Sequence, residues 1–481
     1  MFPSHRRKGI VKRLYARMAM SSDTRRSRRW FLRQSVCAAV GTTALANTLF
    51  DLRRIAAAAS GPSSLLSGDY RALVCIFLYG GNDGNNTLVP ASGSDYADYA
   101  AARGVLALPQ TALLPLAPLS GGGGRPWGLH PSLAGLDGLF GQQKLAIVGN
   151  VGPLVAPMTR SDYLNNTVAS PPNLFSHSDQ QVHWQTSIPD QAPRTGWGGR
   201  TADMVHALND SQSVSMSISL AGTNTYEVGN LVTQFQLSPT GTVGLTNYVE
   251  GPGADPVSVG IHDLLGMSYG NLLDGAYGST TREAIDVNAL LGGALASSPP
   301  PTNTYPVSSL GDQLKMVARL IGAREALGQR RQIFFCSAGG FDTHSGQVTA
   351  QASLLSDIAG SLVAFQTSLA TLGIEGSVTT FTASDFSRTW RDNGSGSDHA
   401  WGGHHVVVGG AVQGGRIFGT LPTLVAGGPD DAGSQGRWIP TTSVDEYAAT
   451  LARWFGVAES DLDAVFPNLH RFNSRNLGFL G

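Results

Sequence analysis

The chain has 481 residues, of which 42% are hydrophobic and 14% are charged, and its formal net charge is −1. This length suits one large globular domain or two ordinary ones. The near-neutral balance excludes a general electrostatic attraction to nucleic acid or to an acidic membrane surface, so we expect no nucleic-acid partner.

Residues 1–60 have the composition of an export signal. Arginines are frequent at the start, and a mildly apolar segment, Val36–Phe50, and a small-residue run, Ala56–Ala59, follow them. A basic region, an apolar region and a small-residue site are the parts of a cleavable signal. The Arg28-Arg29 pair, followed by two apolar residues, resembles a twin-arginine (Tat) signal, which implies passage through the Tat translocase.

The alternative for the same segment is an N-terminal membrane anchor. The apolar run is shorter than the roughly 20 residues that span a bilayer, so cleavage is the favoured interpretation. We therefore expect a periplasmic or secreted mature protein with no permanent membrane span.

Arg71–Tyr79 is a continuous apolar run of strand-forming residues. Such a run is typical of a parallel strand that is covered on both faces. It leads into Gly80–Asn86, which contains Asp83. Because ligands bind beyond the carboxyl ends of strands in open α/β sheets, Asp83 is a candidate metal ligand. A turn made of Asn, Asp and Gly explains these residues equally well.

A polar segment around Ser176 and Ser178 precedes a helix-like stretch. Ser178 with Gln181 fits a capping box, and a helix N-terminus also attracts anions. A serine there is either a nucleophile or a cap, and both interpretations stay open. His177 and His183 are six residues apart and so lie on different faces of a helix, and we do not expect them to be a ligand pair.

Residues 211–250 contain two stretches in which apolar and polar residues alternate with a period of two, at Val214–Leu220 and Leu231–Leu237. This pattern predicts strands, and we expect a small β-rich insertion at about 211–250.

Two later apolar runs also end in candidate ligands. Gln332–Ser337 leads to Asp342 and His344, and Ser377–Ala383 leads to Asp385. Acids, arginines and histidines are then crowded into residues 385–405, which is unexpected in a chain with so few charges. This concentration predicts a functional loop, and its members are Asp385, Arg388, Arg391, Asp392, Asp398, His399, His404 and His405.

Together, the strand ends predict a metal centre. Mixed Asp and His ligands suit Zn, Mn or Fe rather than Ca. One or two such divalent ions would bind a phosphoryl-like group and activate a serine or water. A buried polar network is the alternative. The candidate ligands are Asp83, Asp342, His344, Asp385, Asp398, His399 and His404.

Four separate motifs carry a family resemblance: Leu73–Pro90, Phe175–Gln180, Gly340–His344 and Ser384–Gly419. In this order they resemble the DUF1501 family, a domain of unknown function placed by similarity in the alkaline phosphatase/sulfatase superfamily. The resemblance implies a single domain over residues 68–481. It further implies a doubly wound α/β fold with a mostly parallel sheet and with metal ligands on loops at the strand ends.

The resemblance also assigns roles by position. Asp83 matches the first-strand aspartate that binds metal, and Ser176 or Ser178 falls where the nucleophile would lie. Asp385 matches the aspartate of an Asp-His step, but Phe386 stands where the superfamily has histidine.

The late histidine of the superfamily is His399 or His404, and His404 fits better because an apolar run starts right after it, at Val406. Asp342 and His344 match an Asp…His pair, although they are closer together than usual.

Two functions follow. The first is a metal-dependent hydrolase of phosphate or sulfate esters, acting on an anionic small molecule or polymer, in which Arg388 binds an anionic oxygen. The second is a non-catalytic cell-envelope or polysaccharide-binding protein on a degenerate alkaline phosphatase-like fold. The density of acids and histidines favours the first function, whereas Phe386 and the short Asp342–His344 spacing favour the second.

Overall fold

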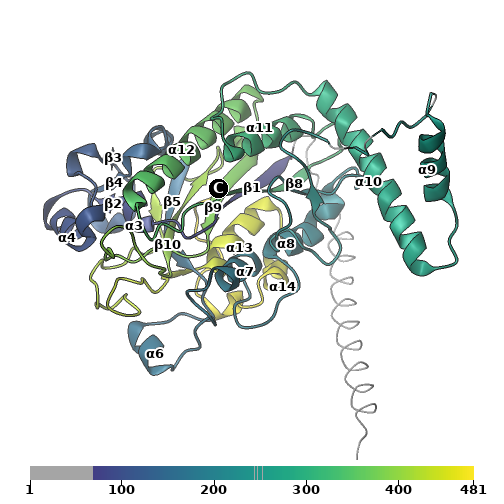
Figure 1. Cartoon of the computed structure of the whole chain (residues 1–481). Coiled ribbons are helices and arrows are strands. Elements are labelled where there is room, and N and C mark those ends of the chain that lie inside the picture. The colour runs from purple at the N-terminus through teal and green to yellow at the C-terminus, as the bar shows by residue number, and fades with distance from the viewer. Residues whose placement is uncertain (1–68, 243, 246, 252) are drawn as a thin grey trace, which may run out of the picture. The chain divides into compact units, whose positions relative to one another are not determined.

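The computed structural model describes residues 69–481 except for residues 243, 246 and 252 (Figure 1). The export signal predicted at residues 1–60 lies outside the described residues. The described residues all belong to one compact unit.

The described residues are built on a nine-stranded sheet with the order β11-β5-β10-β9-β1-β8-β6-β7, in which β12 also pairs with β5. Most neighbouring strands are parallel, and β10 is antiparallel to both β9 and β5. The predicted α/β class with a mostly parallel sheet is therefore confirmed. The strands are β1 Arg71–Leu78, β5 Leu145–Gly152, β6 Ser217–Ser219, β7 Phe235–Gln236, β8 Arg331–Ala338, β9 Val378–Ser384, β10 Gly403–Val408, β11 Ile417–Phe418 and β12 Thr442–Ser443.

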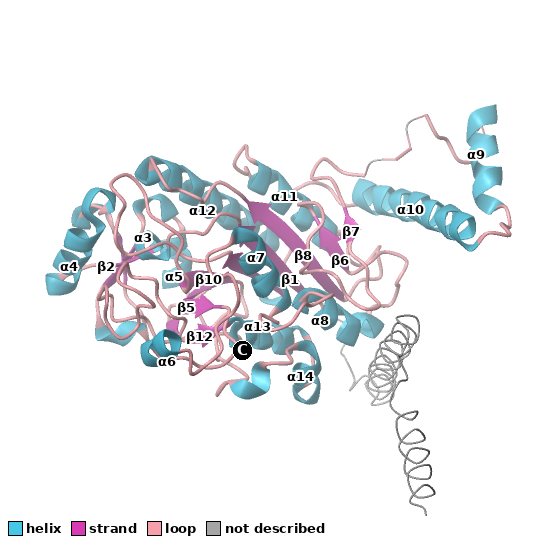
Figure 2. Cartoon of the chain, turned by 60° about the horizontal axis from the view of Figure 1, so that its bottom comes forward, coloured by secondary structure: helices cyan, strands magenta, loops and turns pink. Residues whose placement is uncertain are grey.

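Helices cover both faces of this sheet (Figures 1 and 2). Alternate residues of β1 belong to two different apolar clusters, because Val74 and Ile76 pack with one and Cys75 and Phe77 with the other. This burial on both faces explains why the strand is apolar without alternation. The first cluster includes residues of α11 (Ser309–Gly322) and α12 (Gln347–Thr371), and the second includes residues of α8 (Trp197–Val205) and α13 (Val444–Phe455).

Among the described helices, α12 is the one with the length and apolarity to cross a membrane. Leu355, Ile358, Leu362 and Phe365 of this helix are buried in the first core cluster. Its apolar character therefore has an explanation in the packing of the core.

A second, antiparallel sheet of three short strands lies after β1 in the chain. It consists of β2 (Leu88–Pro90), β4 (Trp127–Leu129) and β3 (Leu114–Leu116), in that order. The remaining helices are α3 Gly84–Thr87, α4 Gly93–Arg103, α5 Leu136–Gly141, α6 Arg160–Asn165, α7 His177–Thr186, α9 Pro256–Gly266, α10 Leu272–Ser297 and α14 Leu462–Val465.

The segment at about 211–250, which was expected to be a β-rich insertion, does not form a separate sheet among its described residues. Each alternating stretch does contain a short strand, β6 in the first and β7 in the second, and both strands extend the main sheet in parallel. Alternation of apolar and polar residues is typical of a strand with one exposed face. In β6, however, Ser217 and Ser219 are buried as fully as Ile218 between them. The helices α9 and α10, which pack on each other, follow this segment.

The register of the central strands places three loops side by side. Leu78, the last residue of β1, pairs with Ala338 at the end of β8 and with Ser384 at the end of β9. Because all three strands run parallel, their following loops start at the same edge of the sheet.

Candidate metal centre

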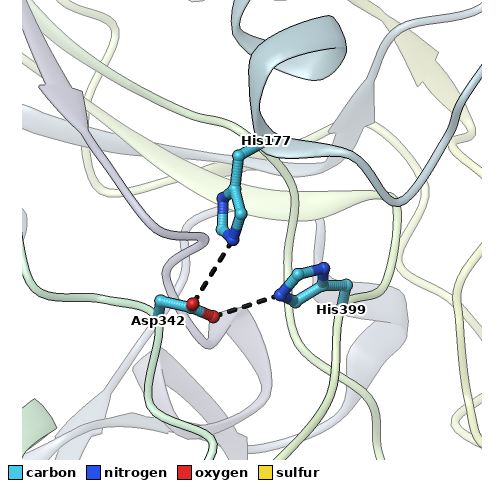
Figure 3. A group of neighbouring side chains, drawn as sticks. All are labelled: His177, Asp342 and His399. Carbon is cyan, nitrogen blue, oxygen red and sulfur yellow. Dashed lines mark hydrogen bonds and ion pairs between the residues drawn. The ribbon is translucent and has the colours of Figure 1, made fainter.

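Three side chains from different parts of the chain meet at this edge of the sheet (Figure 3). Asp342 follows β8, His177 is the first residue of α7, and His399 lies in the loop before β10. Each offers one ligand atom, and these atoms all lie within 4.8 Å of one another, which is compact enough to hold a metal ion.

Asp342 is the centre of the group. Its Oδ1 lies 3.1 Å from His399 Nε2 and 3.0 Å from His344 Nε2. Its Oδ2 lies 3.4 Å from His177 Nε2. One carboxylate thus faces the Nε2 atoms of three imidazoles, and we call these four residues the His–Asp cluster.

The other nitrogen of each imidazole is paired with an oxygen. His177 Nδ1 lies 2.6 Å from Asp385 Oδ2, His399 Nδ1 lies 2.8 Å from the carbonyl oxygen of Phe175, and His344 Nδ1 lies 3.3 Å from Asp398 Oδ1. A carbonyl accepts, as does an ionised carboxylate, so these contacts place a proton on each Nδ1. The Nε2 lone pairs are then left to face Asp342. Metal-binding histidines have this same arrangement of a paired second nitrogen.

The two closest imidazole nitrogens need a positive charge between them. His344 Nε2 and His399 Nε2 are 3.0 Å apart, and two lone pairs at that distance repel. A cation or a protonated ring would remove this repulsion. Burial lowers the pKa of His399, which disfavours the protonated form of that ring. Two nitrogens bound to one zinc ion are about 3.3 Å apart, so the spacing suits a metal.

Asp385 lies behind His177 and is fully buried. Its Oδ2 accepts hydrogen bonds from His177 Nδ1, from Gln181 Nε2 at 3.0 Å and from the backbone N–H of Gly80 at 3.3 Å. Its Oδ1 has no hydrogen-bond partner among the described residues. Burial raises the pKa of Asp385, and the hydrogen bonds oppose this effect. Asp385 therefore orients a candidate ligand and does not belong to the cluster itself.

Arg388 holds the central carboxylate in place. Its guanidinium is fully buried and donates to Asp342 Oδ1 at 2.7 Å and to the carbonyl oxygen of Ser397. Burial acts to raise the pKa of Asp342, but the hydrogen bond and the positive charge of Arg388 help to bring it below its ordinary value. The predicted role of Arg388 in binding an anionic oxygen thus competes with contacts inside the protein.

Asp83 lies in a buried network beside the cluster. It is the N-cap of α3, where its Oδ1 accepts from the N–H of Asn85 at 3.0 Å. Its Oδ2 forms a buried ion pair with Arg103 and accepts from Gln347. Asp83 was expected to bind a metal ion, but its carboxylate is paired with the guanidinium of Arg103 instead.

The two late histidines occupy different environments. His404 lies inside β10, where it is buried and its Nδ1 accepts from the N–H of Asn150 at 3.1 Å. Burial lowers the pKa of His404 to about 4. His399 lies in the loop before the strand and joins the cluster. The expectation that His404 fits the late-ligand position better therefore does not agree with the structure, because side chains within a sheet are directed into its faces.

Neither predicted serine is directed at the cluster. Ser176 is the N-cap of α7, but its Oγ donates to Asp179 at 2.6 Å. Ser178 Oγ lies 3.1 Å from Ser176 Oγ. The expected capping box of Ser178 and Gln181 does not form, because α7 starts at His177 and Ser178 already lies inside the helix. Gln181 donates to Asp385.

His177, between the two serines, is the residue that sequence reasoning missed. Its spacing from His183 excluded a pair on one helix face, but that argument does not test partners elsewhere in the chain. A useful signal was its place inside the motif Phe175–Gln180, at a helix start that follows a loop.

Phe386 packs against two cluster members. Its buried ring stacks on His399 with a centroid separation of 4.4 Å and lies 4.8 Å from the ring of His177. A phenyl ring supplies no donor atom, so Phe386 supports two imidazoles at the position where the resemblance expects a ligand.

Comparison with solved structures finds loose overlaps with a sulfatase, with Ps i-CgsB and with a phosphonate monoester hydrolase. A sulfatase from Pseudoalteromonas sp. (PsFucS1) aligns with a TM-score of 0.32 and 11% identity, over 85% of this chain and 72% of that one. Ps i-CgsB in complex with k-i-k-neocarrahexaose aligns with a TM-score of 0.31 and 8% identity, over 84% and 75%. The phosphonate monoester hydrolase of Agrobacterium radiobacter aligns with a TM-score of 0.28 and 8% identity, over 81% and 74%. These overlaps are too loose to identify equivalent residues.

No curated protein sequence matches the chain significantly. A family model described as "Protein of unknown function (DUF1501)" matches residues 280–432. The matched segment contains Asp342, His344 and His399, whereas His177 lies before it. The predicted resemblance to this family is thus confirmed over residues 280–432.

Proposed function

We propose that this protein is an exported, metal-dependent hydrolase of phosphate or sulfate esters, with its metal held by the His–Asp cluster. One observation carries the proposal: each histidine of the cluster has its Nδ1 paired with an oxygen acceptor and its Nε2 facing Asp342. With a proton on each Nδ1, the neutral imidazoles direct three Nε2 lone pairs towards a carboxylate, and this arrangement becomes favourable when a cation lies between them.

The donor set fits a transition metal. Three imidazole nitrogens and one carboxylate oxygen suit Zn, Mn or Fe better than Ca. We propose one ion per chain, because Arg103 pairs with Asp83 and Phe386 has no donor atom. Bound at these residues, a divalent ion supplies a Lewis acid that polarises an ester oxygen.

The chain's own residues would orient the reaction. Asp385 fixes the ring of His177, Asp398 fixes the ring of His344, and Arg388 keeps Asp342 ionised. Because Ser176 donates to Asp179, we propose that water rather than a serine attacks the ester.

The basic leader supports export through the Tat translocase to the periplasm or beyond. The composition of residues 1–60, with the Arg28-Arg29 pair, supports this part of the proposal. Tat substrates cross the membrane folded, which would allow the metal to be bound in the cytoplasm.

Metal analysis of the protein purified after export tests the cluster. We expect about one equivalent of Zn, Mn or Fe per chain in the wild type. His399→Ala should lose most of it, and His262→Ala, which alters an exposed histidine on α9, should retain it. A folded wild-type protein without stoichiometric metal would contradict the proposal.

Hydrolysis assays with the metal-loaded protein test the activity. Aryl sulfates, aryl phosphates and aryl phosphate diesters form a suitable panel, and Asp342→Ala should abolish turnover of the preferred ester.

A second candidate is a non-catalytic binding protein of the cell envelope. The contacts of Ser176 and Ser178 with Asp179 favour it, because they direct the hydroxyls of both predicted nucleophiles away from the cluster. A metal-loaded protein that binds a polysaccharide but hydrolyses no ester would support this second function.

A further inference from the structure

The side chains in and behind the His–Asp cluster are rich in negative charge. Asp342 and Asp398 have side chains that are 44% and 51% exposed, and both contact His344. Asp385 lies behind His177, and Asp179 lies in the first turn of the same helix. Four carboxylates therefore belong to the cluster or to the groups next to it.

Few positive charges oppose them. The guanidinium of Arg388 is buried and bonded to Asp342 and Ser397. Arg437 donates to the carbonyl oxygen of His399 at 3.0 Å and covers the ring of Phe175 at 4.5 Å from its centroid. These contacts hold the two arginines on groups of the protein itself.

A second metal ion would add positive charge, but the side chains expected to hold one are not available to it. Arg103 neutralises Asp83, and Phe386 packs its ring on His399. One divalent ion together with Arg388 and Arg437 would about balance the four carboxylates, and the site would then have little net positive charge. A substrate with two negative charges would meet more repulsion there than one with a single charge.

We infer that this site takes esters with a single negative charge, such as sulfate monoesters or phosphate diesters, in preference to dianionic phosphate monoesters. The inference rests on the proposed metal-dependent hydrolase. It names the charge of the substrate, which the identity of the ligands alone does not determine.

Binding of small esters to the zinc-loaded protein tests this inference without requiring turnover. Methyl sulfate and dimethyl phosphate are monoanions, whereas methyl phosphate is a dianion at pH 8, because the second pKa of a phosphate ester is about 6. We expect both monoanions to bind about tenfold more tightly than methyl phosphate, as measured by titration calorimetry. Equal or tighter binding of methyl phosphate, or no binding of either monoanion, overturns the inference.

A charge-removing variant tests the electrostatic cause. In Asp398→Asn the amide oxygen can still accept from His344 Nδ1, and only the charge is lost. We expect the preference for methyl sulfate over methyl phosphate to fall about threefold to fivefold. The matched control is Asp210→Asn, which removes an exposed acid paired with Arg330 near the other end of β8.

The control should leave the preference unchanged, with the metal content measured for every variant. An unchanged preference in Asp398→Asn with full metal content would overturn the electrostatic cause, and so would an equal effect in Asp210→Asn.

Hydrolysis of matching 4-nitrophenyl esters separates this inference from the proposed function. A metal-loaded protein that prefers monoanions but hydrolyses none of the esters would refute the hydrolase and uphold the charge preference. A protein that hydrolyses 4-nitrophenyl phosphate fastest would support the hydrolase and overturn the charge preference. A protein that binds no metal would overturn both.

Discussion

His177 Nδ1 lies 2.6 Å from Asp385 Oδ2, so the first residue of α7 is bonded to the residue that follows β9. The bond joins two segments that are 208 residues apart in the sequence. It fixes the imidazole so that Nε2 faces Asp342. Asp385, which we expected to bind metal, instead positions a histidine that does not stand out in the sequence.

Removing the charge of Asp385 should weaken metal binding without abolishing it. Loss of a carboxylate partner behind a ligating histidine typically costs about 10- to 100-fold in metal affinity. We expect an effect of that size in Asp385→Asn, measured by competition with a chromogenic chelator. Asp392→Asn is the control, because Asp392 accepts a local hydrogen bond from Gly394. An unchanged affinity in Asp385→Asn would show that His177 is not a ligand.

Asp83 should prove structural. Removing one member of a buried ion pair costs about 3–5 kcal/mol, and Asp83 also accepts from Gln347 and from the N–H of Asn85. We expect Asp83→Asn to lower the free energy of unfolding by about 3 kcal/mol in urea titrations, while the folded fraction keeps its metal. An exposed pair such as Asp210–Arg330 should contribute less than about 1 kcal/mol. Loss of metal from a stable Asp83→Asn protein would restore Asp83 as a ligand.

Glu227 should make stability depend on pH. Its side chain is fully buried, with Asn224 donating to Oε2 at 2.8 Å, and burial raises its pKa from 4.5 to about 8. Between these two values the folded state holds a proton that the unfolded state has released. The contribution of Glu227 to stability is therefore present below pH 4.5 and is lost as the pH rises towards 8.

Glu227→Gln tests this linkage. We expect the variant to gain stability relative to the wild type, by more than about 1 kcal/mol, when urea unfolding is compared at pH 5 and pH 8. Gln keeps an oxygen that can accept from Asn224. A constant difference between the two proteins across this range would mean that Glu227 is ionised in the fold.

The leader should direct export through paired arginines. We expect Arg28→Lys with Arg29→Lys to leave most of the protein in the cytoplasm in its precursor form, as followed by cell fractionation. Arg53→Lys with Arg54→Lys is the control, because it alters a second arginine pair in the same leader. Normal export of the first variant would contradict a twin-arginine route.

The sequence by itself determined the α/β class and the edge of the sheet at which the candidate site lies. Apolar runs such as Arg71–Leu78 predict buried strands because burial on both faces removes polar residues from a strand. Asp342 and Asp385 follow two such strands, and chain order alone therefore placed them near one edge. These are local patterns, which a single sequence can display.

Only the tertiary structure decided which side chains meet. His177 joins the cluster, whereas Asp83 pairs with Arg103 and His404 lies buried inside β10. These outcomes depend on the direction in which α7 starts, on the packing of the helix α4 that ends at Arg103, and on the residue at which β10 begins. Each of these is a packing relationship between separate segments of the chain. Hydrophobic periodicity carries no information about such relationships, because the period reports only which face of one element is buried.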